Sequence, residues 1–179
     1  MRIVDLLPEP SLRVQRIVAA AVILTQGGMS AADASHPLVL ARALTQRAQQ
    51  LCIGLESGVA DLYELVTPTT AELLHWWFGD GAREGRPYNF HAGQRQAILN
   101  VIVAHEVLDS PDLPDLYRQV CAEALLTGSR LSEVSQPKHA HPKYCLKMAT
   151  GTGKTWVLQA LLVWQLLNRT AALDAGRDD

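Results

Sequence analysis

The sequence predicts an α/β fold in which a mostly helical N-terminal region is followed by the start of a second, strand-and-helix domain. The first half of the chain shows apolar residues at helical spacing, separated by glycine and proline breaks. The second half contains a short extended run, a glycine-rich turn and an apolar helix in direct succession, an order typical of parallel α/β proteins. Only one clear strand is present, so we expect the α/β domain to be incomplete in this chain.

Three helices are expected in the first half. Ser11 can cap a helix over residues 11–24 that ends at two consecutive glycines. A second helix begins at Ser30 or Asp33 and continues to about residue 55. The third, over residues 69–78, carries a leucine, tryptophan and phenylalanine cluster that we assign to the core, with a partner-covered surface as the alternative.

A polar, glycine-rich break at residues 79–87 marks a domain boundary. We therefore divide the chain into a helical N-terminal region, residues 1–86, and a second domain, residues 87–179. The second domain begins with a helix that ends near residue 108 and a shorter helix over residues 115–126.

The expected strand covers residues 144–148, and an apolar helix runs from Lys154 to about Asn168. Between residues 156 and 167 this helix is polar only at Gln159 and Gln165. A helix that is apolar nearly all round is expected to be buried on all sides. Unless the N-terminal helices cover it, we expect the isolated chain to be unstable.

The composition is that of a globular protein, with 48% hydrophobic and 19% charged residues. The net charge of −2 gives no electrostatic sign of a dedicated nucleic-acid binder. Cys52, Cys121 and Cys145 lie far apart and are expected to be reduced thiols. Neither a signal-peptide pattern nor a membrane-spanning stretch is found, so we expect a cytoplasmic protein without membrane association.

Smaller groups of polar residues are expected to have no special chemistry. Arg83, Arg86 and Arg95 form a loose basic group that we assign to a solvated face. His139, His141 and Cys145 lack a fourth ligand at a recognised spacing, so no metal site is expected there.

The strongest motif is the glycine-rich turn, Met148-Ala149-Thr150-Gly151-Thr152-Gly153-Lys154-Thr155. Its two glycines allow the backbone to point successive N–H groups at an anion, and the following helix adds its positive end. Lys154 is then expected to reach the β- and γ-phosphates, and the Thr155 hydroxyl to ligate Mg²⁺. We predict a P-loop for ATP and Mg²⁺ formed by Thr150, Gly151, Thr152, Gly153, Lys154 and Thr155. The alternative is a glycine turn with a chance Lys-Thr pair, since Met148 stands where the strict pattern has glycine.

Phe90 and Gln94 form a second constellation upstream of this loop. A glutamine amide donates and accepts at once, matching the N6 and N7 edge of adenine, and an aromatic neighbour can cover the base. We assign both residues to the adenine side of the nucleotide. A glutamine that caps a helix or faces solvent is the alternative.

The two motifs together resemble those of superfamily 2 helicase-like ATPases, particularly the motor (Res) subunits of type III and type I restriction enzymes. Residues 148–155 are similar to that group's motif I, and residues 90–98 to its glutamine motif. The resemblance covers about residues 87–168 and implies the start of a RecA-like P-loop domain. It also implies an ATP-hydrolysing motor that acts on duplex DNA, with a methyltransferase or specificity subunit as partner.

Later elements of such a motor are not found after the apolar helix: no Asp-Glu pair on a strand, no second motor lobe and no nuclease centre. We therefore interpret the chain as the N-terminal part of a DNA-translocating ATPase, truncated after the P-loop helix and without catalytic residues of its own. The alternative is a truncated, non-catalytic binding or vestigial module whose helical first half contacts a partner. A nucleotide kinase would instead carry its P-loop close to the N-terminus.

Overall fold

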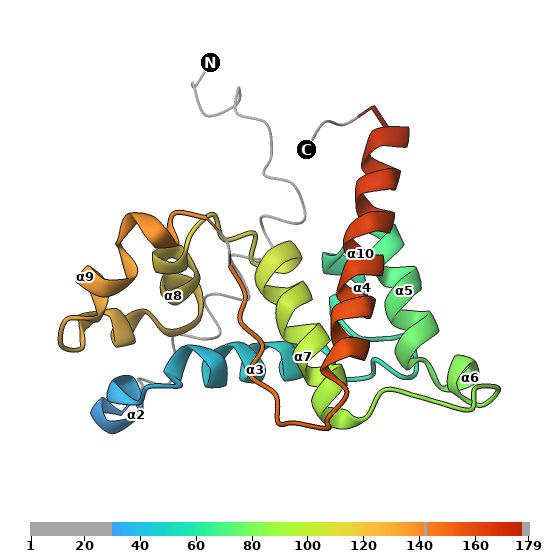
Figure 1. Ribbon diagram of the computed structural model, residues 1–179, viewed down its shortest axis with the longest axis horizontal. Helices are drawn as coiled ribbons and strands as arrows, with labels where there is room; N and C mark the ends of the chain where they lie inside the picture. The colour runs from blue at the N-terminus through green and yellow to red at the C-terminus, as the bar shows by residue number, and fades with distance from the viewer. Residues whose placement is uncertain (1–29, 142, 177–179) are drawn as a thin grey trace, which may run out of the picture.

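The computed structural model describes residues 30–141 and 143–176, and within these residues the fold is helical and contains no strand (Figure 1). The helices are Ala31–Ser35 (α2), Val39–Leu51 (α3), Leu62–Leu65 (α4), Pro68–Phe78 (α5), Asp80–Arg83 (α6), Ala92–Ile102 (α7), Leu113–Cys121 (α8), Arg130–Val134 (α9) and Lys154–Asp174 (α10). Shorter turns follow α7, α8 and α9: a π-helical turn at Val103–Val107 (η2) and 3₁₀ turns at Ala122–Leu126 (η3) and Pro137–His139 (η4). The helix expected over residues 11–24 lies outside the described residues.

The helices α5 and α10 begin within one residue of their expected starts, at residue 69 and at Lys154. Thr67 caps α5 by accepting a hydrogen bond from the backbone N–H of Thr70, and Pro68 occupies the first turn. The single helix expected from residue 30 or 33 to residue 55 is instead two helices, α2 and α3. His36 precedes Pro37 and has extended backbone angles, because proline disfavours helical geometry in the residue before it.

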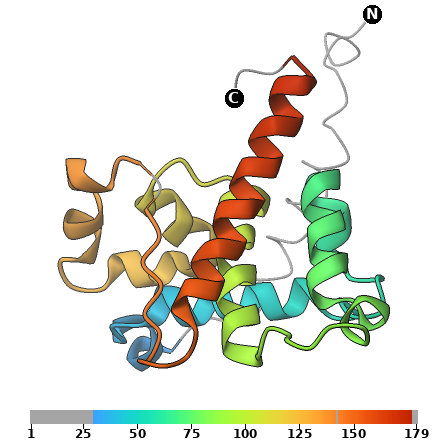
Figure 2. The ribbon, with the colours of Figure 1, turned by 45° about the vertical axis from the view of Figure 1, so that its right-hand side comes forward.

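The main hydrophobic core lies where α3, α5, α7 and α10 meet (Figures 1 and 2). It includes Leu51 and Leu74 from the first half of the chain and Ile98, Val157 and Trp164 from the second half. Residues on both sides of the predicted boundary at 79–87 therefore share one core. The boundary itself stays a prediction, and the helix α6 lies within the expected break.

The predicted helical character is confirmed, but the α/β arrangement is not seen in the described residues. Residues 144–148 are extended without forming a strand. Leu146 and Met148 pack against the core, while Cys145 and Lys147 are exposed. A parallel strand needs neighbouring strands for its hydrogen bonds, and the part of the chain that the structure describes supplies none.

The apolar helix α10 is buried along one side only. Val157, Ala160 and Trp164 face α5 and α7, whereas Leu158, Leu162 and Leu166 are exposed. Burial on all sides was therefore the wrong expectation for the described residues, because α5 and α7 cover a single stripe of this helix. The helix also continues to Asp174, beyond its expected end near Asn168.

A polar network within the core ties α10 to α5 and to the π-helical turn η2. The Glu106 carboxylate accepts hydrogen bonds from the Thr70 hydroxyl (2.7 Å), the Trp164 indole N–H (3.2 Å) and the backbone N–H of Thr67. The hydroxyl oxygen of Thr70 lies 2.9 Å from both the Trp164 Nε1 and the Asn168 Nδ2 donors. Buried polar groups stabilise a fold only when they are paired, so this network orients α10 against α5.

Replacing Thr70 with valine removes the shared hydroxyl while keeping the shape of the side chain. We expect Thr70→Val to lower the free energy of unfolding by about 1–3 kcal/mol, because buried donors on Trp164 and Asn168 lose an acceptor. Urea denaturation measures the change. Thr69→Val in the same helix is the matched control, since Thr69 is partly exposed, and it should change stability by less than about 0.5 kcal/mol. Equal effects of the two substitutions would contradict the role given to this network.

Candidate functional site

The glycine-rich turn joins the extended run to α10 and has the backbone geometry that the motif requires. Gly151 has φ +80° and Gly153 has φ +73°, both in the left-handed region that favours glycine. Thr152 closes the turn locally, because its hydroxyl donates to the Ala149 carbonyl oxygen at 2.7 Å. Gly153 is the N-cap residue of α10, so the turn ends where the helix begins.

The first turn of α10 presents unpaired donors beside two exposed side chains. The backbone N–H groups of Lys154 and Thr155 find no acceptor among the described residues, as is usual in the first turn of a helix. The side chains of both residues are exposed. A helix N-terminus with free N–H groups and a nearby lysine suits an anion such as a phosphate group, and the Thr155 hydroxyl is an oxygen donor suited to Mg²⁺. The residues present therefore fit a magnesium-bound polyphosphate.

Gln94 contacts the glycine-rich turn directly. Its side-chain carbonyl oxygen accepts from the backbone N–H of His91 at 3.1 Å, and its amide nitrogen donates to the Thr152 carbonyl oxygen at 3.1 Å. The His91 Nδ1 accepts from the Gln94 backbone N–H, which places the ring proton on Nε2, 3.1 Å from the same Thr152 oxygen. His91 and Gln94 thus cap the N-terminus of α7 and clamp the turn through one shared acceptor.

This geometry decides what Gln94 does in the structure. The residue is only 8% exposed, and both ends of its amide are hydrogen-bonded to protein atoms. The capping role that the sequence left open is present, and the adenine role stays a prediction. The sequence analysis did not predict a role for His91. Its position three residues before Gln94, at the start of a helix, could have indicated the cap.

Phe90 lies between the first turn of α10 and the end of α5. The centroid of its ring is 5.8 Å from Trp156, 5.8 Å from Phe78 and 6.1 Å from Trp77, with steep angles between the ring planes. Edge-to-face contacts of this kind stabilise aromatic clusters and hold the rings in place. Phe90 therefore connects the predicted nucleotide loop with the aromatic cluster of the N-terminal region.

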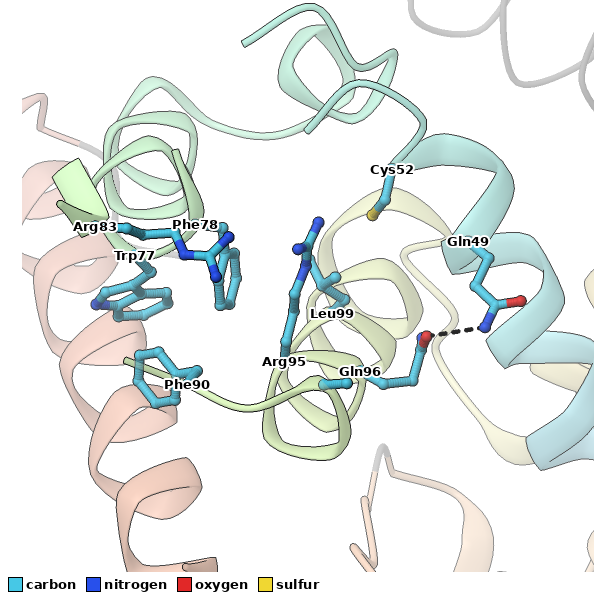
Figure 3. Close-up of a pocket in the computed structure, with 10 residues that line it drawn as sticks. Gln49, Cys52, Trp77, Phe78, Arg83, Phe90, Arg95, Gln96 and Leu99 are labelled. Carbon is cyan, nitrogen blue, oxygen red and sulfur yellow. Dashed lines mark hydrogen bonds between the residues drawn. The ribbon is translucent and has the colours of Figure 1, made fainter. Parts of the chain in front are cut away.

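A half-open cavity of about 380 Å³ lies beside this cluster, between α3, α5, α6 and α7 (Figure 3). Its lining residues are Gln49, Cys52, Trp77, Phe78, Arg83, Phe90, Ala92, Arg95, Gln96 and Leu99. The volume falls in the range of small-molecule sites in proteins. The sequence did not predict this cavity, because its walls come from segments far apart along the chain.

An ion pair and a cation–π contact set the electrostatics of the cavity. Arg95 bonds to the Glu56 carboxylate, and this hydrogen bond lowers the pKa of Glu56 below its ordinary value. The Arg95 guanidinium also lies 5.4 Å from the centre of the Phe78 ring. Burial raises the pKa of the Cys52 thiol to about 11, which favours the protonated form of this thiol at neutral pH.

Among the described residues, no three His, Cys, Asp or Glu side chains are close enough together to hold a metal ion. His139 and His141 line a small hollow beside Tyr144, and Cys145 is exposed and does not line it. Within the same part of the chain, no helix has both the length and the apolar character needed to cross a membrane.

Comparison with known protein families finds one match, in the second half of the chain. Residues 87–173 match the family described as type III restriction enzyme, res subunit. This stretch, called here the res-subunit segment, is similar to that family. The res-subunit segment contains the Gln94 clamp, the glycine-rich turn and nearly all of α10, and the resemblance noted from the motifs is confirmed. The family comprises helicase-like motors of restriction enzymes, which use ATP with Mg²⁺ and interact with DNA. No curated protein and no solved structure matches the chain.

The two left-handed glycines of the loop allow a paired test of the clamp. A Cβ atom at Gly153 would lie 2.3 Å from the Gln94 amide nitrogen, whereas a Cβ at Gly151 would meet open space. Both alanine substitutions carry the strain of a positive φ. We expect Gly153→Ala to lower the free energy of unfolding by about 0.5–2 kcal/mol more than Gly151→Ala does. The difference is about the value of a helix cap, because the Gln94 side chain must leave its hydrogen-bond partners.

Urea denaturation of Gly153→Ala and Gly151→Ala measures this difference. In a Gln94→Ala background the obstacle and the clamp are both absent, so the two variants should become equally stable to within about 0.5 kcal/mol. A difference that persists without the glutamine side chain would show that Gln94 is not what Gly153 must avoid.

Proposed function

We propose that the res-subunit segment binds ATP with Mg²⁺ at the turn that precedes α10. The observation that carries the proposal is the pair of left-handed glycines, Gly151 and Gly153, directly before a helix N-terminus with exposed Lys154 and Thr155. This arrangement gathers backbone N–H donors, a positive helix end and a flexible cation around one point. The family assignment of the segment supports the same ligand.

Each residue of the loop has a role that follows from its chemistry. Lys154 neutralises the β- and γ-phosphates, and Thr155 provides a hydroxyl ligand to the Mg²⁺ that accompanies the nucleotide. Thr150, Gly151, Thr152 and Gly153 supply the backbone curve around the phosphates. Gln94 and His91 hold that curve in place through the Thr152 carbonyl oxygen.

For the whole protein, the proposed activity is ATP-driven movement on duplex DNA within a restriction or related DNA-processing system. The support is the match to the res-subunit family, together with the nucleotide loop inside the matched residues. A methyltransferase or specificity subunit is the partner expected for such a motor. A binding module without ATPase activity would share the same nucleotide site, and steady-state hydrolysis with and without duplex DNA separates the two functions.

Lys154→Ala tests the nucleotide site. We expect the Kd for MgATP to rise on the order of 10- to 100-fold, because a charge-assisted contact to phosphate contributes about 1.5–3 kcal/mol. Inorganic tripolyphosphate with Mg²⁺ should lose affinity by a similar factor, since Lys154 contacts the phosphates and not the base. Isothermal titration calorimetry measures both ligands.

Lys147→Ala is the matched control for charge. Lys147 is also exposed and lies in the extended run before the loop, so its loss should change the Kd by less than about threefold. Failure of the unmutated chain to bind tripolyphosphate, or equal losses in the two lysine variants, would overturn the proposed site.

A further inference from the structure

We infer that the backbone of duplex DNA lies along three lysines that precede the glycine-rich turn, Lys138, Lys143 and Lys147, called here the basic ridge. The inference rests on the proposed function, which supplies duplex DNA as the polymer on which the whole protein acts. It adds a surface that contacts DNA and that lies outside the nucleotide loop and outside residues 90–98.

Positive charge is concentrated in one stretch of the chain. All four lysines of the protein lie within residues 138–154, and residues 134–173 contain five Lys and Arg side chains without any Asp or Glu. The other 139 residues contain 11 basic and 18 acidic side chains. The net charge of −2 therefore averages a positive segment with an acidic remainder. Such a segment attracts a polyanion even when the whole protein is weakly acidic.

The extended backbone at residues 143–148 places two of these lysines on one side. Lys143, Cys145 and Lys147 are exposed, whereas Leu146 and Met148 pack against the core. Alternate side chains of an extended chain point to opposite sides, so Lys143 and Lys147 face solvent together, about 13 Å apart along the backbone. Figures 1 and 2 show this run between α8 and α9 on one side and α10 on the other.

Lys138 continues the ridge beyond the extended run. The Lys143 ammonium group donates to the Lys138 carbonyl oxygen at 3.0 Å, which brings these two residues next to each other. This hydrogen bond uses one of the three N–H donors of Lys143 and leaves its charge in place. Within residues 30–141 and 143–176, none of the three ridge lysines forms an ion pair with a carboxylate. Their charge is therefore available to a bound anion.

An acidic residue adjoins the ridge at one end. Asp112 lines the same small hollow as His139, His141 and Lys143. Its carboxylate accepts a hydrogen bond from the backbone N–H of Asp115 at 2.8 Å and caps α8. This carboxylate therefore has a structural role at a helix N-terminus, where a negative charge is stabilising.

Aromatic contacts on the inner side hold the ridge in place. The Tyr144 ring packs edge to face on His105 at 6.0 Å, and the His105 ring packs in the same way on Trp164 at 5.5 Å. The Tyr144 hydroxyl oxygen also lies 3.4 Å from the His105 Nδ1. These contacts join the extended run to η2 and α10. A backbone that is already ordered lowers the entropic cost of binding a ligand.

The composition of the ridge fits a nucleic-acid backbone better than an acidic protein. Protein interfaces are depleted in lysine and have an apolar centre, whereas the exposed side chains between Lys143 and Lys147 are those of Cys145 and Tyr144. A DNA strand carries one phosphate about every 3.4 Å along its axis, so lysines spaced along an extended run meet phosphates of any base sequence.

The test measures DNA binding without nucleotide, so its result does not depend on the nucleotide loop. Fluorescence anisotropy with a short labelled DNA duplex gives the Kd at several salt concentrations. In the triple variant Lys138→Gln/Lys143→Gln/Lys147→Gln, we expect the Kd at low salt to rise on the order of tenfold or more. The slope of log K against log salt should fall by about 2–3, because each phosphate contact contributes about 0.9 to it.

Two controls match this variant. The triple variant Lys138→Arg/Lys143→Arg/Lys147→Arg keeps the charge and should keep the salt slope to within about 0.5. Arg83→Gln removes one positive charge from α6, which lies on the far side of α10 from the extended run (Figure 1). It should leave the slope unchanged, whereas Lys147→Gln alone should lower it by about 1. Circular dichroism confirms that the variants are folded.

The outcomes separate the DNA surface from the nucleotide site. The inference is overturned if the unmutated chain does not bind the duplex, or if the glutamine variant keeps its salt slope. Equal losses in the arginine and glutamine variants also overturn it, because charge would then not be what binds. Displacement of the DNA by polyglutamate at equal charge concentration would favour an acidic protein and overturn it as well. Failure to bind tripolyphosphate overturns the proposed nucleotide site and leaves the DNA result unaffected.

Discussion

The buried indole N–H of Trp164 imposes a constraint on which the arrangement of the helices depends. The large Trp164 side chain, from the middle of α10, is buried in the core, and its indole N–H needs hydrogen-bond acceptors there. Thr70 and Glu106 provide them, one from α5 and one from the π-helical turn after α7. Glu106 lies within this π-helical turn, a kind of irregularity that is rare in helices. The direction of α10, and with it the place of the loop at its N-terminus, follows from this pairing.

The second organising element is the N-terminus of α7. Its cap, made by His91 and Gln94, holds the Thr152 carbonyl oxygen, while the adjacent stripe from Ala92 to Leu99 lines the cavity. One short helix therefore supports both the glycine-rich turn and the aromatic wall contributed by α5. Residues of the N-terminal helical region and of the res-subunit segment thus line the same cavity.

Local features were predicted best. The start of α10 after Gly153 depends on residues within one turn of each other, so a short-range pattern was enough to find it. The strand at residues 144–148 was not formed, because a strand depends on partners that no local pattern supplies. The apolar sequence of α10 indicated burial without indicating how much of the helix its neighbours would cover.

By itself, the sequence determined the glycine-rich turn, the positive φ it requires, the Lys154-Thr155 pair and the family that residues 87–173 resemble. These properties lie in consecutive residues, and backbone sterics alone link them to their geometry. Only the tertiary structure decided that Gln94 clamps the loop and that Arg95, Trp77 and Gln49 surround one cavity. Those contacts join segments separated by many residues, and they arise from the packing of α3, α5 and α10 around α7, which no single segment encodes.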